Sequence, residues 1–139
     1  MQRTILSFVL AFFCGSVAAE WTLLASDTVR TEAPGTVAGR GTKVFIDKNS
    51  ITKEGTRATM YTLTDYESPL MVGGKRQLST KSLDEYDCEN KKYRTLAYYW
   101  YSRHQAKGDL IYDDTAPGRM QPILDGSTIE DAWKIACGK

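Results

Sequence analysis

The sequence predicts an α+β fold: a single antiparallel β-sheet of five or six strands, with a C-terminal α-helix packed on one face and pinned by a disulfide. Three observations predict it. Apolar and polar residues alternate with a period of two over most of the chain. The apolar period changes to that of a helix only near the C-terminus. Two cysteines, Cys88 and Cys137, remain once an N-terminal export signal is removed.

Residues 1–19 have the pattern of a removable signal peptide. Arg3 precedes a mainly apolar run, Ile5 to Cys14, and small residues follow as far as Ala19. The run is too short to cross a bilayer, which needs roughly 20 apolar residues. We therefore expect cleavage after Ala19, export to the periplasm or cell surface, no membrane span in the mature chain, and one domain over residues 20–139.

Export determines how the cysteines are interpreted. Cys14 is removed with the signal, so Cys88 and Cys137 are left in an oxidising compartment, where two cysteines usually pair. A metal site or a catalytic thiol would need further ligands or a base at suitable spacing, and the chain has a single histidine, His104. Closing a loop of about 50 residues stabilises a domain by roughly 4 kcal/mol in the chain-entropy model.

Six segments have the alternation of β-strands and are separated by turn-forming residues. The predicted strands are Trp21–Ala25, Lys43–Asp47, Arg57–Asp65, Arg76–Asp87, Lys92–Arg103 and Leu110–Tyr112. The predicted connectors are Thr31–Thr42, Lys48–Ser50, Ser68–Gly74, Glu89–Lys91 and Lys107–Asp109. Most of these connectors are too short for the crossovers that parallel strands need, so the sheet is predicted to be antiparallel.

The predicted helix begins at a capping box. Ser127 and Glu130 have the spacing at which each side chain bonds a free amide of the first turn. One helical face carries the apolar residues Ile129, Ala132, Trp133, Ala136 and Cys137. Gly138 is suited to end the helix. We expect Trp133 to lie against the sheet and the disulfide to join the helix end to the turn between the fourth and fifth strands.

The fifth strand is rich in aromatic residues on both faces, and one helix can cover only one face of the sheet. Strict alternation places Leu96, Tyr98 and Trp100 on one face, and Tyr93, Ala97, Tyr99 and Tyr101 on the other. Two interpretations remain open. The tyrosines are half-buried by neighbouring side chains of a central strand, or they form an exposed aromatic strip of the kind that marks a dimer or ligand interface.

No catalytic set emerges from the sequence. His104 stands in a polar turn without a partner nucleophile, and the acidic residues Asp109, Asp113 and Asp114 lack the spacing of a calcium loop. We therefore expect no enzyme activity, no cofactor and no metal. Removing Arg3 with the signal leaves 17 Lys and Arg residues against 17 Asp and Glu residues, so the chain lacks the basic excess of a nucleic-acid-binding protein.

Several short motifs, taken in order, resemble the bacterial surface-adhesin protein E family over essentially the whole mature chain. They are Trp21, Phe45-Ile46-Asp47, Ser50-Ile51, Leu63-Thr64-Asp65-Tyr66, Glu85-Tyr86-Asp87-Cys88, Lys91-Lys92-Tyr93-Arg94, Gly126-Ser127 and Trp133-Lys134-Ile135-Ala136-Cys137-Gly138. The resemblance implies a small antiparallel sheet joined to a C-terminal helix by a disulfide, and an adhesin that binds host matrix or serum proteins. The chain departs from the lipid-anchored pattern at Phe12 and Phe13, which stand where a lipid-attachment signal has small residues.

The family resemblance directs attention to one basic and aromatic cluster. Lys91, Lys92 and Arg94 lie close in sequence to Tyr99 and Tyr101. Cationic and aromatic side chains near one sheet edge are suited to protein recognition. The leading hypothesis is an exported, non-enzymatic cell-envelope protein that binds a protein partner there. The alternatives are a solvated turn beside core aromatics, and a periplasmic structural or stress-related protein that acts as a homodimer.

Overall fold

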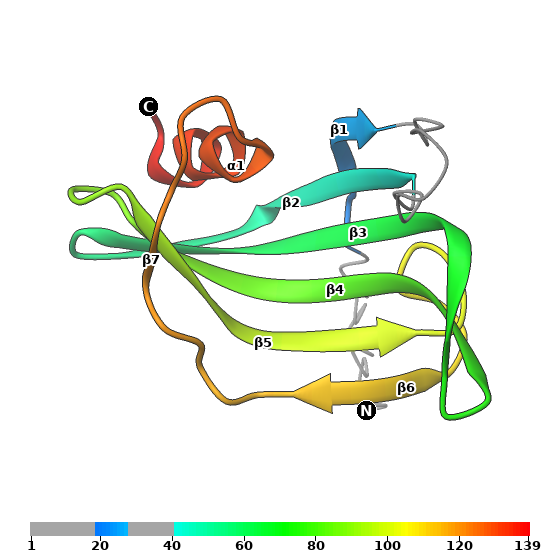
Figure 1. Cartoon of the computed structure of the whole chain (residues 1–139). Coiled ribbons are helices and arrows are strands. Elements are labelled where there is room, and N and C mark those ends of the chain that lie inside the picture. Colours follow the sequence, from blue (N-terminus) through cyan, green and yellow to red (C-terminus); the bar gives the residue numbers. More distant parts are fainter. Residues whose placement is uncertain (1–18, 28–40) are drawn as a thin grey trace, which may run out of the picture.

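The computed structural model describes residues 19–27 and 41–139 and confirms the predicted α+β fold (Figure 1). Its elements are β1 (Thr22–Asp27), β2 (Thr42–Glu54), β3 (Arg57–Val72), β4 (Lys75–Asp87), β5 (Lys92–Tyr101), β6 (Leu110–Asp114), β7 (Gln121–Pro122) and α1 (Thr128–Cys137). The predicted signal peptide and most of the connector 31–42 lie outside the described residues.

The strands form one antiparallel sheet in the order β1-β2-β3-β4-β5-β6, and the short β7 pairs with the start of β5. From β1 to β6, consecutive strands are therefore neighbours, as the mostly short connectors predict. The hairpin between β3 and β4 turns at Gly73 and Gly74, both of which have positive φ (55° and 77°). Such a two-residue turn favours glycine, because a side chain at positive φ is strained.

Two predicted breaks are wrong, because they lie within strands as bulges: Lys48–Ser50, and the Ser68-Pro69 part of the connector Ser68–Gly74. The other part of that connector, Gly73-Gly74, is a turn as predicted. Lys48–Ser50 interrupts the register of β2 against β3 without ending either strand. Ser50 Oγ donates to Asp47 O (2.7 Å) and accepts from Tyr61 N (2.9 Å), so side-chain bonds replace the missing ladder bonds. Pro69 lies where the register of β3 against β4 shifts, and there its missing N–H costs no ladder bond.

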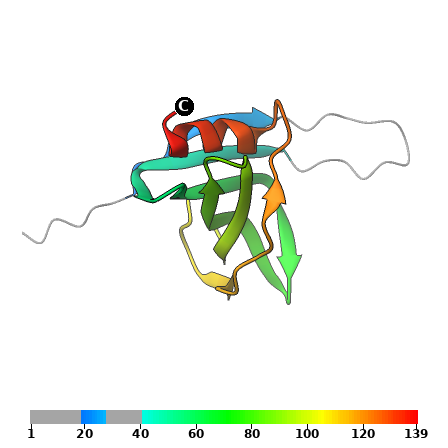
Figure 2. The ribbon, with the colours of Figure 1, turned by 90° about the vertical axis from the view of Figure 1, so that its left-hand side faces the viewer.

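The helix forms a second layer over one end of the sheet. It contacts β1, β2, β3 and β4, and in Figure 1 it lies above the end at which the β2–β3 and β4–β5 hairpins turn. The view at right angles shows α1 stacked on β2, above strongly twisted strands (Figure 2). We call the whole face that carries α1 the helix-side face. The helix covers one end of this face and leaves the rest uncovered.

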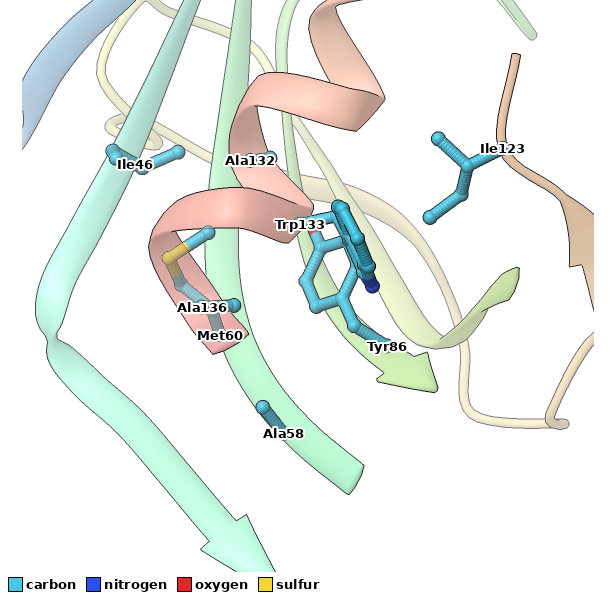
Figure 3. Packing of buried hydrophobic residues seen from close by; sticks show 8 residues of the cluster. All are labelled: Ile46, Ala58, Met60, Tyr86, Ile123, Ala132, Trp133 and Ala136. Atoms are coloured by element: carbon cyan, nitrogen blue, oxygen red, sulfur yellow. The ribbon is translucent and has the colours of Figure 1, made fainter. Parts of the chain in front are cut away.

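The main core lies between α1 and the sheet (Figure 3). Its buried members are Ile46, Ala58, Met60, Tyr86, Ile123, Ala132, Trp133 and Ala136. Met60 and Ala136 have no exposed surface, and Trp133 lies against the sheet as predicted. Burial of apolar surface between the two layers is the main force that holds the helix in place.

The helix ends match the sequence prediction in most respects. Ser127 Oγ accepts from Glu130 N (3.2 Å), as a capping box requires. The Glu130 carboxylate, however, accepts from Gly126 N (2.6 Å) because Ser127 N already bonds Leu124 O. Gly138 ends the helix in the left-handed conformation (φ 70°).

The C-terminal end of α1 is fastened to the β4–β5 turn. The Cys88–Cys137 disulfide joins residues 49 apart in sequence, as predicted. Trp133 Nε1 donates to Asp87 O (3.0 Å) in the same turn. The covalent bond and the hydrogen bond hold the helix to a rigid hairpin end.

Candidate binding surface

The face of the sheet opposite α1, which we call the helix-free face, carries a patch of half-buried aromatic side chains. Tyr61 of β3 and Tyr99 and Tyr101 of β5 lie near one another there. Lys81 of β4 is paired with Tyr99 in the register and places its Nζ 4.3 Å from the centroid of the Tyr61 ring. This distance is that of a cation–π contact. We call Tyr61, Lys81, Tyr99 and Tyr101 the aromatic–basic patch.

The patch is partly desolvated. Burial raises the pKa of Tyr101, and the neighbouring Tyr99 and Tyr61 act in the same direction. All four side chains of the patch are intermediate between buried and exposed. They thus combine accessible surface with a fixed position, which is the condition for contributing strongly to an interface.

A pocket of about 510 Å³ borders the patch. It is lined by Trp21 ahead of β1, by Lys81 and Tyr101 of the patch, and by Gln105 and Ala106 of the loop between β5 and β6. A second pocket of about 440 Å³ lies on the other side of Gln105, beside Phe45. On the helix-free face, these two hollows are therefore separated by one loop, loop 102–109.

Loop 102–109 is held on the face by buried polar groups. Both oxygens of Asp65 accept hydrogen bonds from Gln105, one from its backbone N (2.8 Å) and one from Nε2 (2.7 Å). Ser79 Oγ donates to Arg103 O (2.6 Å) and accepts from Ala106 N (3.1 Å). Asp65 and Ser79 are both buried. Hydrogen-bonded buried polar groups fix a loop geometrically, because breaking the bonds leaves them unsatisfied.

The backbone of this loop is in an uncommon conformation. Gln105 and Ala106 have positive φ values of 59° and 53° although neither is glycine. Consecutive residues in the left-handed region persist only where surrounding contacts hold them, and such outliers concentrate at functional sites. The observation makes the hollow beside Ala106 a candidate site.

The predicted basic residues are divided between the two faces. Arg94 lies on the helix-free face with Tyr99 and Tyr101, but its Nε is bonded to Glu85 (2.8 Å). Arg57 bonds the same carboxylate oxygen at 2.6 Å. Lys92 is exposed at the start of β5, opposite Asp87 in the register.

Lys91 contacts residues at the start of α1 and lies apart from Tyr99 and Tyr101. Its Nζ bonds Glu130 (2.7 Å) and Asp125, and lies 5.7 Å from the centroid of the Trp133 ring. These bonds raise the pKa of Lys91. The structure thus brings Arg94, Tyr99 and Tyr101 to one face, and places Lys91 at the N-terminal end of α1.

The prediction that Tyr93 shares a face with Tyr99 and Tyr101 is wrong. Leu83 pairs with Ala97 but Asp84 pairs with Thr95, so Leu96 is the extra residue of a bulge. The bulge reverses the alternation, and Tyr93 packs against the core under α1. Tyr99 and Tyr101 keep their predicted common face.

The sequence did not single out Tyr61, Lys81 or Trp21 as members of the site. Tyr61 and Lys81 are brought together by the register of β3 against β4, and Trp21, which precedes β1, lines the same pocket as Lys81. A lysine in the middle of an alternating strand was the available signal, since a charged residue beside aromatic strands often covers an aromatic face.

His104 and the acidic doublet have structural surroundings. His104 Nε2 is hydrogen-bonded to Tyr66 O (2.9 Å) at the tip of loop 102–109. Asp114 accepts from Ala116 N (2.8 Å). Within residues 19–27 and 41–139, no three His, Cys, Asp or Glu side chains are grouped as metal ligands. No helix in those ranges is long and apolar enough to cross a membrane.

Comparison with known proteins agrees with this architecture. Crystal form II of Haemophilus influenzae protein E has the same fold, with a TM-score of 0.60 and 15% identity over 68% of this chain and 80% of that chain. Protein E from non-typeable Haemophilus influenzae matches with a TM-score of 0.57 and 15% identity over 68% of this chain and 69% of that chain. A search of curated protein sequences finds no match.

A match to a family model shows which family of proteins the chain is related to. The model described as surface-adhesin protein E matches residues 31–138, which includes every described element from β2 to α1. The chain therefore belongs to the surface-adhesin protein E family.

Proposed function

We propose that this protein is a non-enzymatic binding protein of the bacterial cell envelope that recognises a protein partner through the aromatic–basic patch. The observation that carries the proposal is the arrangement of Tyr61, Tyr99 and Tyr101 around Lys81 on the face that α1 leaves uncovered. Tyrosine and cationic side chains are enriched among the anchoring residues of protein interfaces.

The family assignment supports an adhesin as the specific form of this function. Its partner would be a matrix or serum protein of a host. Arg94 at the margin of the patch would add a cationic contact, and loop 102–109 would give the partner a rigid ridge between two hollows. We expect the protein to be exported, with cleavage after Ala19, and N-terminal sequencing of the secreted form tests that step.

The binding experiment compares one residue on each face. The purified protein is tested by surface plasmon resonance against a panel of host matrix and serum proteins and an envelope extract. Tyr99→Ala should weaken the interaction about tenfold or more, because truncating an anchoring aromatic residue costs about 2 kcal/mol. The control is Tyr112→Ala on the opposite face, whose side chain is 44% exposed. Equal binding by wild type and Tyr99→Ala would contradict the assigned surface.

Location and self-association are separate measurements. Protease treatment of intact cells should degrade an adhesin, which must face outward, and should spare a periplasmic protein. Light scattering on wild type and Tyr99→Lys tests whether the same patch pairs two copies of this chain. A monomer in both samples removes the homodimer alternative.

A further inference from the structure

The helix-side face contains a pocket of about 250 Å³ at the N-terminal end of α1. Its walls come from the first turns of the helix and from β1 to β5. Its lining residues include Leu24, Val44, Thr62, Asp84, Thr95 and Ile129. This pocket lies on the opposite face from the aromatic–basic patch, so it is independent of the function proposed above.

A buried carboxylate forms part of the wall. Asp84 is only 8% exposed. Its Oδ2 accepts from Thr62 Oγ1 and its Oδ1 accepts from Thr95 Oγ1, both at 2.7 Å. A carboxylate offers about four acceptor positions, so two hydroxyl donors satisfy only part of its capacity.

Among the described residues, no cationic side chain lines this pocket. The described lining residues include Asp84 and two tyrosines but no lysine, arginine or histidine. Burial without a cationic partner raises the pKa of Asp84, although the bonds from Thr95 and Thr62 oppose that effect. An asparagine could bond both threonines, accepting from one through Oδ1 and donating to the other through Nδ2, without the cost of a buried charge. The fold alone therefore does not explain why a carboxylate stands at this position.

The remaining walls are suited to an aliphatic chain. Leu24, Val44 and Ile129 are apolar, and the first turn of α1 carries Glu130 and Asp131, which offset the partial positive charge of the helix N-terminus. The hydroxyl groups of Thr64 and Ser82 supply further polar contacts.

An aromatic cluster continues the same face beyond the pocket. Ser82 pairs with Tyr98, and the ring of Tyr98 lies 6.0 Å from that of Trp100 and 5.9 Å from that of Tyr112. Aromatic faces beside a carboxylate favour the approach of a cation.

We propose that this pocket binds an organic cation, an ammonium or guanidinium group on an aliphatic stem, with the charged group at Asp84. Two sources have this chemistry: a free amine, or a lysine or arginine side chain of a protein partner. The cation supplies the charge-assisted hydrogen bonds that the two threonines leave unmade.

The test uses the purified protein and isothermal titration calorimetry. Butylammonium should bind, and butanol, which has the same stem without the charge, should bind at least about tenfold more weakly, since a buried charge pair contributes at least this factor. This comparison needs no variant and is unaffected by folding defects. Equal binding of the two probes, or binding of neither, would overturn the proposal.

A variant pair locates the charge. Asp84→Asn should reduce butylammonium affinity about tenfold or more, whereas Asp113→Asn, the same change at an exposed position of β6, should leave it unchanged. Unchanged affinity in Asp84→Asn would overturn the assignment. Tighter binding of Nα-acetyl-lysine amide than of butylammonium identifies a protein side chain as the source, and the reverse order identifies a free amine.

The affinity of the wild type should also fall between about pH 7 and about pH 4, because the cation binds the ionised form of Asp84 and burial raises the pKa of this carboxyl above its ordinary value of about 4. Among the described residues, the other titratable groups around the pocket are Tyr86, Tyr93 and, in the first turn of the helix, Asp131 and Glu130 with its partner Lys91. The Glu130→Gln variant should keep the pH dependence, which separates Asp84 from the helix terminus. A wild-type affinity that is independent of pH over this range would contradict the role of Asp84.

Discussion

On the helix-side face, α1 covers an apolar cluster in which Met60 and Ala136 have no exposed surface. On the helix-free face, loop 102–109 is held over the sheet by Asp65 and Ser79, which are buried and polar. The helix is held on its face by non-directional apolar burial and a covalent link. Loop 102–109 is held on the other face by directional hydrogen bonds.

The difference explains how each face can bind a ligand. A helix that packs along its length covers the surface beneath it, and the pocket at Asp84 lies beside its first turns. A loop held at two points leaves hollows on both of its sides. The helix-free face is therefore suited to a broad partner, and the helix-side face to a small group.

The largest expected effect is on the covalent link of the helix-side face. Replacing Cys88 and Cys137 with alanine should lower the free energy of unfolding by about 4 kcal/mol, because the bond closes a loop of about 50 residues in the unfolded chain. Denaturant unfolding followed by far-UV circular dichroism measures the change. Wild type under reducing conditions should match the variant, and a loss well below 1 kcal/mol in both would contradict the role assigned to the disulfide.

The second-largest expected effect is the destabilisation caused by truncating buried residues of β3, one on each face. Met60→Ala should destabilise the protein by about 3 kcal/mol, because it leaves a cavity beneath α1. Leu63→Ala, equally buried on the helix-free face, should cost about 2 to 3 kcal/mol if that face has a core of its own. The exposed Leu70 gives the control, with an expected change within about 0.5 kcal/mol. A negligible cost at Leu63 would contradict a separate core on the helix-free face.

A smaller and more local effect is expected at loop 102–109. Asp65→Ala removes both acceptors of Gln105 and should cost about 2 kcal/mol, the penalty for leaving a buried donor unsatisfied. Amide hydrogen exchange should accelerate over residues 102–109 and stay unchanged in α1. Asp113→Ala on exposed β6 is the matched control. Unchanged exchange in the loop would show that Ser79 holds it alone.

Sequence reasoning succeeded where one periodicity decided the structure. The three-and-four spacing that placed Trp133 against the sheet, the cap at Ser127 and the stop at Gly138 were confirmed, as was the pairing of Cys88 with Cys137. Each is either local along the chain or fixed by the small number of cysteines. The fold class follows from these features and from short connectors.

Sequence reasoning failed where bonds join distant segments or where a bulge interrupts a strand. Asp65 is forty residues from Gln105 in the sequence and has the polarity of a surface position, so alternation gave no signal that it is buried. The bulge at Leu96 reversed the expected face of Tyr93. Lys91 was grouped with the aromatic residues because it is near them in sequence, but it bonds Glu130, thirty-nine residues away. Register and long-range pairing are three-dimensional properties that local pattern does not determine.

The smallest expected effect at neutral pH lies at that ion pair, and it becomes measurable in acid. Hydrogen bonds from Lys91 and from Gly126 N, in that order, lower the pKa of Glu130 from 4.5 to about 2. A carboxyl whose pKa is lower in the folded state contributes stability that is present above its unfolded pKa and is lost as the pH falls through the folded value. Glu130→Gln should therefore flatten the loss of thermal stability between about pH 4.5 and about pH 2. Glu89→Gln, in the exposed β4–β5 turn, should leave the acid profile of the wild type intact. If both variants lose stability in parallel with the wild type, the result would contradict a contribution of the Lys91–Glu130 ion pair to stability in acid.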